Sequence, residues 1–99
     1  MNLHFNEQDV IDSCCVFVAR RYNGNPEQVD VDLQHNPSFG FSADARKGFQ
    51  NIHLSQQDII DGIAMYLAEY HNFIPDRLRV DLQFNPQTGI EANVMVVYD

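Results

Sequence analysis

Two histidines stand at the same distance from an aspartate, and imidazole with carboxylate is a ligand set that Zn²⁺, Ni²⁺ and Mn²⁺ accept. His4 precedes Asp9 by five residues, and His53 precedes Asp58 by five residues. Two ligands per cluster are too few for a metal centre, and the spacing matches no recognised metal motif. Helix capping explains both aspartates completely. The sequence therefore predicts no metal ligand, and no cofactor, at either histidine.

The two cysteines, Cys14 and Cys15, are neighbours inside a helical pattern. A disulfide between adjacent residues would be badly strained. No basic residue lies near enough in the sequence to lower the pKa of a thiol. Both are interpreted as small core or helix-surface side chains of a reducing cytoplasm. A reactive thiol pair remains the alternative.

Five acidic residues alternate with apolar residues on two predicted hairpins. Paired carboxylates can do acid–base chemistry when they are buried and perturb one another. Here the alternation is typical of a solvated face, and Arg46 and Arg79 lie near enough to offset the charge. Calcium or a basic protein partner is the alternative use of that face, although the chain has no Asp-x-Asp-x-Asp-Gly loop. The residues are Asp30, Asp32, Asp44, Asp81 and Glu91.

No motif of an enzyme accompanies these residues. The sequence contains no Gly-x-Ser-x-Gly, no phosphate-binding loop and no dinucleotide fingerprint. We therefore predict no catalytic residue, and the sequence favours a protein that is not an enzyme.

An internal repeat positions all of these side chains. Residues 2–50 align with residues 51–99 without a gap, and 17 of the 49 pairs are identical. Two copies are too few for a stacked array of repeats. A unit of this length is also marginal as an independent fold. We expect one domain, residues 1–99, in which the two units share a core about a pseudo-twofold axis.

Each unit is predicted to be a strand, a helix and a hairpin. Asn6 and Ser55 are expected to cap the two helices, because an aspartate follows each three residues later. The hairpins turn at Asn-Pro-x-x-Gly, where Gly40 and Gly89 supply positive φ. The fold class is therefore α+β, with an antiparallel sheet of up to six strands and two helices on one face.

The connection between the units predicts an exchange of strands. A turn at Lys47-Gly48 places Phe49–Leu54, the first strand of unit two, beside the last strand of unit one. If the pseudo-twofold axis is real, the strand Asn2–Phe5 must lie beside Ile90–Tyr98, at the other end of the chain.

Charge and hydropathy exclude several partners. The formal net charge is −8 and no basic stripe is present, so nucleic acid and anionic membranes are not expected partners. No apolar run approaches the length of a membrane span, and the N-terminus lacks the pattern of a signal peptide. We expect a cytoplasmic protein.

Two stretches resemble a known family: Phe5-Asn6-Glu7-Gln8-Asp9-Val10, which opens the first helix, and Gly40-Phe41-Ser42-Ala43-Asp44, which opens a return strand. Together with the length and the order of elements, they resemble the YxcD-like family of short, uncharacterised Bacillus-type proteins. The resemblance covers the whole chain and implies a cytoplasmic bacterial protein. It transfers no catalytic residue.

The sequence favours a small acidic protein that is a non-enzymatic interaction or structural module. It would bind a protein partner or self-associate, for example as a homodimer, through a sheet edge or a helix face. The alternative is a small-molecule or metal-binding module, or a minor enzyme, with its site at the pseudo-twofold axis near His4 and His53.

Overall fold

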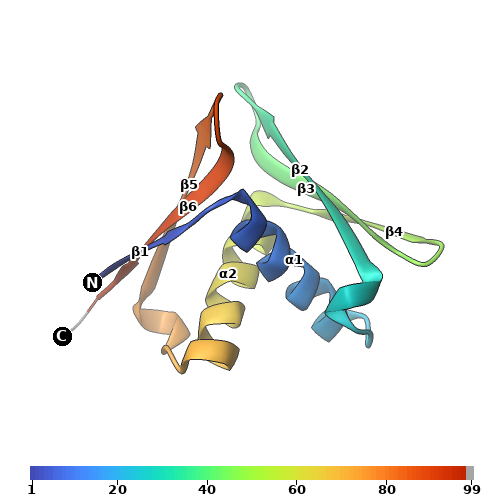
Figure 1. Ribbon diagram of the computed structural model, residues 1–99, viewed down its shortest axis with the longest axis horizontal. Helices are drawn as coiled ribbons and strands as arrows, with labels where there is room; N and C mark the ends of the chain where they lie inside the picture. The colour runs from blue at the N-terminus through green and yellow to red at the C-terminus, as the bar shows by residue number, and fades with distance from the viewer. Residues whose placement is uncertain (98–99) are drawn as a thin grey trace.

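The computed structural model describes residues 1–97 as two helices and six strands (Figure 1). Tyr98, the end of the last predicted strand, lies outside the described residues, as does Asp99. The elements of the first unit are β1 (Asn2–Phe5), α1 (Glu7–Arg21), β2 (Val29–Asn36) and β3 (Gly40–Lys47). Those of the second are β4 (Gln50–Leu54), α2 (Gln56–His71), β5 (Leu78–Asn85) and β6 (Gly89–Val96), and a short 3₁₀ helix precedes β2 (Pro26–Gln28) and β5 (Pro75–Arg77).

Both helices begin with the predicted capping box. The Asn6 side chain accepts a hydrogen bond from the Asp9 N–H at 2.8 Å, and the Asp9 carboxylate accepts one from the Asn6 N–H at 3.0 Å. Ser55 and Asp58 repeat this exchange at 3.1 and 3.0 Å. The two boxes satisfy backbone donors that a helix start leaves unpaired.

The two hairpin turns are equivalent, as predicted. Gly40 has φ of 87° and Gly89 has φ of 91°. The Asn36 side chain accepts from the Ser38 N–H, and the Asn85 side chain accepts from the Gln87 N–H. Each asparagine thus closes its turn locally, and the glycine supplies the left-handed backbone that follows.

The predicted exchange of strands is confirmed. β1 pairs antiparallel with β6, at the opposite end of the chain, and β4 pairs with β3 in the matching register. His4 lies opposite Asn93, just as His53 lies opposite Asp44. Each unit therefore completes the sheet of its twin.

The α+β fold and the duplicated unit are confirmed, but the six strands form two sheets and not one. Their orders are β1-β6-β5 and β2-β3-β4. In Figure 1 the two sheets are inclined toward each other and approach at the top of the view, with both helices below and between them. The two hairpins approach each other where His35 meets Phe84, but β2 and β5 belong to different sheets and do not pair with each other.

Three pairs of equivalent residues meet on the pseudo-twofold axis. The rings of His35 and Phe84 stack at 4.5 Å between centroids, where the hairpins approach. Between the helices, a Cβ on Gly62 would lie 3.4 Å from the Ser13 carbonyl oxygen. Further along, the Arg20 guanidinium donates to the Glu69 carboxylate at 3.0 Å. Because Ser13 lies against Gly62 and Arg20 binds Glu69, α1 and α2 run side by side in the same direction (Figure 1).

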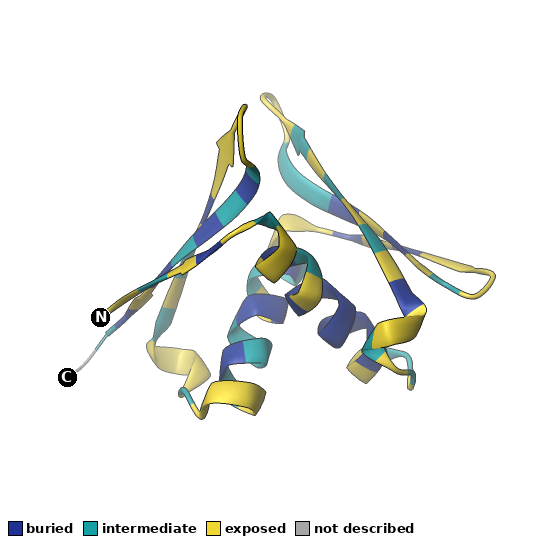
Figure 2. Ribbon diagram, in the orientation of Figure 1, coloured by how far each residue is buried: buried dark blue, intermediate teal, exposed yellow. Residues whose placement is uncertain are grey.

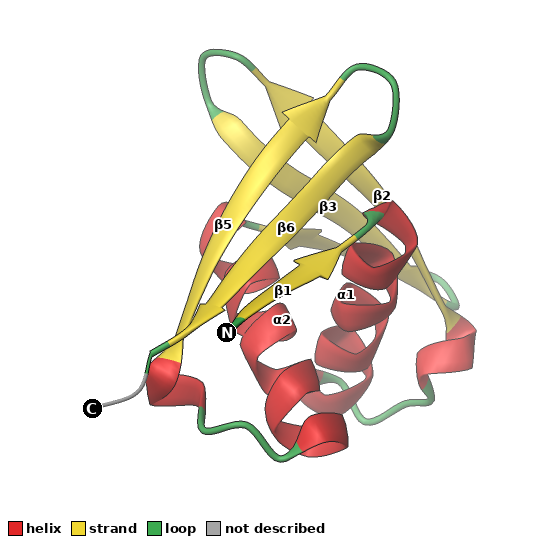
Figure 3. Ribbon diagram, turned by 60° about the vertical axis from the view of Figure 1, so that its left-hand side comes forward, coloured by secondary structure: helices red, strands yellow, loops and turns green. Residues whose placement is uncertain are grey.

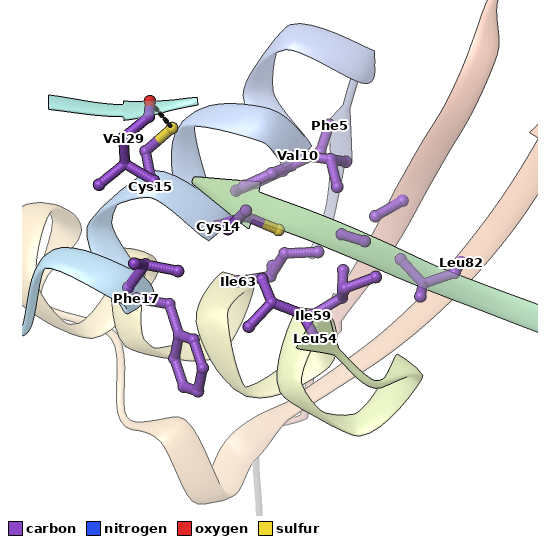
Figure 4. Close-up of a cluster of buried hydrophobic side chains, with 14 of the residues drawn as sticks. Phe5, Val10, Cys14, Cys15, Phe17, Val29, Leu54, Ile59, Ile63 and Leu82 are labelled. Carbon is purple, nitrogen blue, oxygen red and sulfur yellow. Dashed lines mark hydrogen bonds between the residues drawn. The ribbon is translucent and has the colours of Figure 1, made fainter. Parts of the chain in front are cut away.

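One hydrophobic cluster contains residues from both units. Figure 4 shows Cys14 of α1 with Ile59 and Ile63 of α2, all three fully buried, in this cluster. Helix α1 is buried continuously from Ser13 to Ala19, whereas α2 is exposed along part of its length (Figure 2). The fold therefore encloses α1 more completely than its twin.

Candidate functional site

The structure separates the two histidines that the alternative site required. His4 lies on β1 and His53 on β4, so each is exposed on an outer strand of a different sheet. Neither belongs to the contacts on the pseudo-twofold axis, where His35 stacks on Phe84. The contacts described on that axis therefore do not support the alternative site that the sequence placed there near both histidines. Asp9 and Asp58 are occupied in the capping boxes, as the sequence predicts.

Each histidine instead contacts the strand that it pairs with. The His53 Nδ1 lies 3.0 Å from a carboxylate oxygen of Asp44. The equivalent His4 Nδ1 lies 3.1 Å from the amide oxygen of Asn93, with the Glu91 carboxylate 3.4 Å from its other nitrogen. The hydrogen bond from His53 lowers the pKa of the Asp44 carboxyl, and a second one from Gln34 lowers it further. Asp44 therefore stays ionised and is a poor proton donor.

The outer face of the β2-β3-β4 sheet carries the acidic residues. Asp30 lies opposite Arg46, and Asp32 opposite Asp44. Together with His53 they line a hollow of about 600 Å³. Their side chains are exposed, in keeping with the predicted solvated face. Among residues 1–97, no group of three or more His, Cys, Asp or Glu side chains is placed to hold a metal ion.

The second sheet repeats this face with different charges. The residue equivalent to Asp30 is Arg79, which is exposed. Asp81 is also exposed and accepts a hydrogen bond from Gln83 at 3.3 Å. Glu91 is half-buried beside His4. The face of this sheet is therefore mixed in charge, whereas the other is predominantly acidic.

Both thiols are free and buried. Burial raises the pKa of Cys14 to about 12 and that of Cys15 to about 11. The Cys15 thiol donates to the Val29 carbonyl oxygen at 3.4 Å (Figure 4). Because the thiolate is the nucleophile, neither cysteine has the low pKa that a reactive thiol needs.

A smaller hollow lies between β1 and α2. It measures about 240 Å³ and is lined by His4, Asp9, Tyr66 and His71, among others. At the symmetry-related place, between β4 and α1, the Arg21 guanidinium lies over the Phe17 ring and 3.6 Å from the Asp58 carboxylate. The residue equivalent to Arg21 is Tyr70, so Asp9 gains no such partner from α2. The hollow thus reflects a difference between the repeats.

The free edges of the two sheets are the other accessible feature. β2 and β5 are each eight residues long and occupy one edge of their sheets. Figure 3 shows β5 at the outside of its sheet. The opposite edges are short, since β1 has four residues and β4 has five. Long unpaired edges present backbone donors and acceptors to another strand.

Sequence reasoning missed the side chains that fix the turns to the helices. The Glu7 carboxylate accepts from the Ile90 N–H at 2.9 Å, and the Gln56 side chain accepts from the Phe41 N–H at 3.1 Å. Each continues the pairing of β1 or β4 beyond the end of that strand. Only their equivalence as the first helical residue of each unit hinted at a shared role.

The comparisons with known proteins also divide the chain into two halves. The sequence model of the family described as "Protein of unknown function (DUF2653)" matches residues 1–51 and again residues 49–99. The chain belongs to the DUF2653 family. The resemblance to YxcD-like proteins is thereby confirmed, since "Uncharacterized protein YxcD" of Bacillus subtilis (strain 168) is 41% identical over 52 residues.

That alignment covers 52% of this DUF2653 chain and 51% of YxcD, so the chain spans about half the length of the curated relative it matches. No solved structure matches the chain. Neither helix is long and apolar enough to cross a membrane.

Proposed function

We propose that this protein is a non-enzymatic interaction module of the cytoplasm that binds other protein chains by adding a strand to its free sheet edges. The observation that carries the proposal is the pair of long open edges, β2 and β5, in a chain of this size. Peptide recognition by strand addition uses main-chain hydrogen bonds for affinity and alternate side chains for specificity.

The burial pattern supports an edge over the face of helix α1. On β2 and β5 several apolar side chains that face the helices are partly exposed, namely Val31, Leu33, Leu78 and Val80. A partner strand would cover them and bury apolar area as well as form hydrogen bonds. Helix α1 is buried from Ser13 to Ala19 and offers no comparable surface. The two buried thiols, neither of them in a disulfide, support the cytoplasmic location.

A small-molecule site is the second candidate, favoured by the hollow between β1 and α2. Two histidines, a tyrosine and an aspartate line it, and polar side chains of these types can orient ligands. Its volume of about 240 Å³ is below the range of roughly 300–1,000 Å³ that is usual for such sites. A small-molecule site in this hollow is therefore a weaker candidate than binding at the sheet edges.

Blocking the edges tests the proposed function. Proline removes a backbone donor and is tolerated on an edge strand where that donor points to solvent. We expect the double variant Val31→Pro/Val80→Pro to lose the partners that the tagged wild type retains in extracts of its native cell. Circular dichroism must show that the variant is folded. Partners that bind the folded double variant as well as they bind the wild type would reject edge pairing.

A further inference from the structure

We infer that the free edge of β5 is a self-complementary interface, through which two copies of this chain join their β1-β6-β5 sheets into one six-stranded sheet. This inference rests on the proposed function and names its partner as a second copy. It follows from which backbone groups face the edge and from the charges beside them.

The backbone hydrogen bonds of β6 show which groups of β5 face outward. The Ile90 N–H donates to Glu7 and the Val96 N–H to the Met1 carbonyl oxygen, so both point toward the β1 side. Backbone direction alternates along a strand, and residues 91, 93 and 95 therefore face β5. Their partners in register are Gln83, Asp81 and Arg79. Leu78, Val80 and Leu82 then direct their N–H and C=O groups to the free edge.

A twofold pairing centred on Val80 uses all of these groups. In that register Val80 faces Val80 of the second copy, and Leu78 faces Leu82. The apolar side chains of these residues lie on the face toward the helices, where Leu78 and Val80 are half-buried. The interface is closed by its symmetry, so it produces a dimer and not a filament.

Charge selects this register over its neighbours. Centred on Val80, the pairing sets Arg79 opposite Asp81 twice, once on each side of the axis. Centring it one residue away sets Arg79 against Arg79, or Asp81 against Asp81. Opposite charges across an antiparallel pair are favourable, and like charges directly opposite are destabilising. Both side chains are exposed, and within residues 1–97 no ion pair engages either of them.

The charges beside the equivalent edge of β2 oppose the same kind of pairing. The Phe41 N–H points toward the β4 side, where it meets Gln56, so Val31 faces the free edge just as Val80 does. A pairing centred on Val31 would set Asp30 opposite Asp32 twice. The change from Asp30 in one repeat to Arg79 in the other therefore makes one edge self-repelling and the other self-attracting.

The test is the molar mass of the purified protein as a function of concentration, measured by sedimentation equilibrium. We expect the wild type to dimerise. Arg79→Asp or Asp81→Arg alone should raise the dissociation constant about tenfold or more, because each converts two attractive pairs into repulsive ones. The double variant Arg79→Asp/Asp81→Arg restores opposite charges in the same register, and we expect it to dimerise like the wild type.

The repeat supplies a matched control. Val80→Pro should give a monomer, whereas Val31→Pro, at the same place on the other edge, should leave the dimer intact. Since the charge variants preserve the backbone, they test the interface even if a proline variant fails to fold. A monomeric wild type, a double swap that does not recover, or a dimer that depends on Val31 would each refute the β5 interface. A monomeric wild type that still loses its cellular partners when both edges are blocked would refute only this inference and leave the proposed function standing.

Discussion

Replacing Gly89 by alanine should disrupt a contact between the two units that the turn sequence alone does not reveal. Gly89 has φ of 91°, and an alanine held in that region costs about 1 kcal/mol or more. Its Cβ would also overlap the carboxylate of Glu7. Glu7 would have to move and release the N–H of Ile90, to which it is bound at 2.9 Å.

Alanine substitutions at two other glycines show how the expected loss of stability depends on the contact at each turn. Gly48 has φ of 60°, and a Cβ added there would meet no atom within 4 Å, so Gly48→Ala should cost only the backbone term, about 1 kcal/mol. Gly40→Ala adds the loss of a bond to a neutral amide, that of Gln56, and should cost about 2 kcal/mol. Gly89→Ala adds the loss of a bond to a carboxylate, for a total of about 3 kcal/mol.

Thermal and urea unfolding of the three variants would measure this order. For a domain of this size each kcal/mol lowers Tm by roughly 4–8 °C. A cycle with Glu7→Ala isolates the contact, because Gly89→Ala should cost only about 1 kcal/mol once the carboxylate is absent. If Gly89→Ala is no more costly than Gly48→Ala, the carboxylate of Glu7 does not hold the turn.

The remaining predictions concern metal, strand exchange and pH. Calorimetric titration with Zn²⁺, Ni²⁺ and Mn²⁺ should detect no micromolar site, whereas a saturable site lost in both His4→Ala and His53→Ala would contradict this. Deleting residues 1–5 removes β1, exposes β6 as a new edge and should cause aggregation in light scattering; a variant that stays as soluble as the wild type would argue against the exchange. Since the thiol pKa values rise from 9.0 to about 12 and 11 on folding, their contribution to stability is complete below pH 9 and is lost as the pH rises toward these values. The free energy of unfolding should thus fall more steeply above pH 9 for the wild type than for Cys14→Ala/Cys15→Ala, and equal slopes in urea titrations would overturn that assignment.

Local features of this fold could be predicted because a few neighbouring residues specify them. The capping boxes at Asn6 and Ser55 each need two residues three positions apart, and the turns at Gly40 and Gly89 need five consecutive residues. Alternation along the strands correctly marked the solvated face. The exchange of β1 also followed from the sequence, because two gapless repeats related by a pseudo-twofold axis predict a counterpart for the pairing of β4 with β3.

The candidate surfaces depended on contacts between distant segments. Nothing near His4 or His53 in the sequence reveals that they lie on different sheets, because the sequence predicted the partner of each strand but not the division of the hairpins into two sheets. The carboxylate of Glu7 reaches Ile90, 83 residues away. No spacing rule connects positions so far apart, and both features became visible only in the folded chain.

The sequence by itself determined the repeat, the order of elements, the two turns and the side of each strand that faces the helices. Tertiary structure decided that the hairpins form two sheets, and therefore that β2 and β5 keep free edges. The physical reason is the packing of α1 against α2. Close packing at Gly62 and the bond from Arg20 to Glu69 hold α1 against α2, and together the helices stand between the hairpins. Strand periodicity encodes which face is buried, but it does not encode the neighbour along the edge, because that neighbour is chosen by the packing of the whole chain.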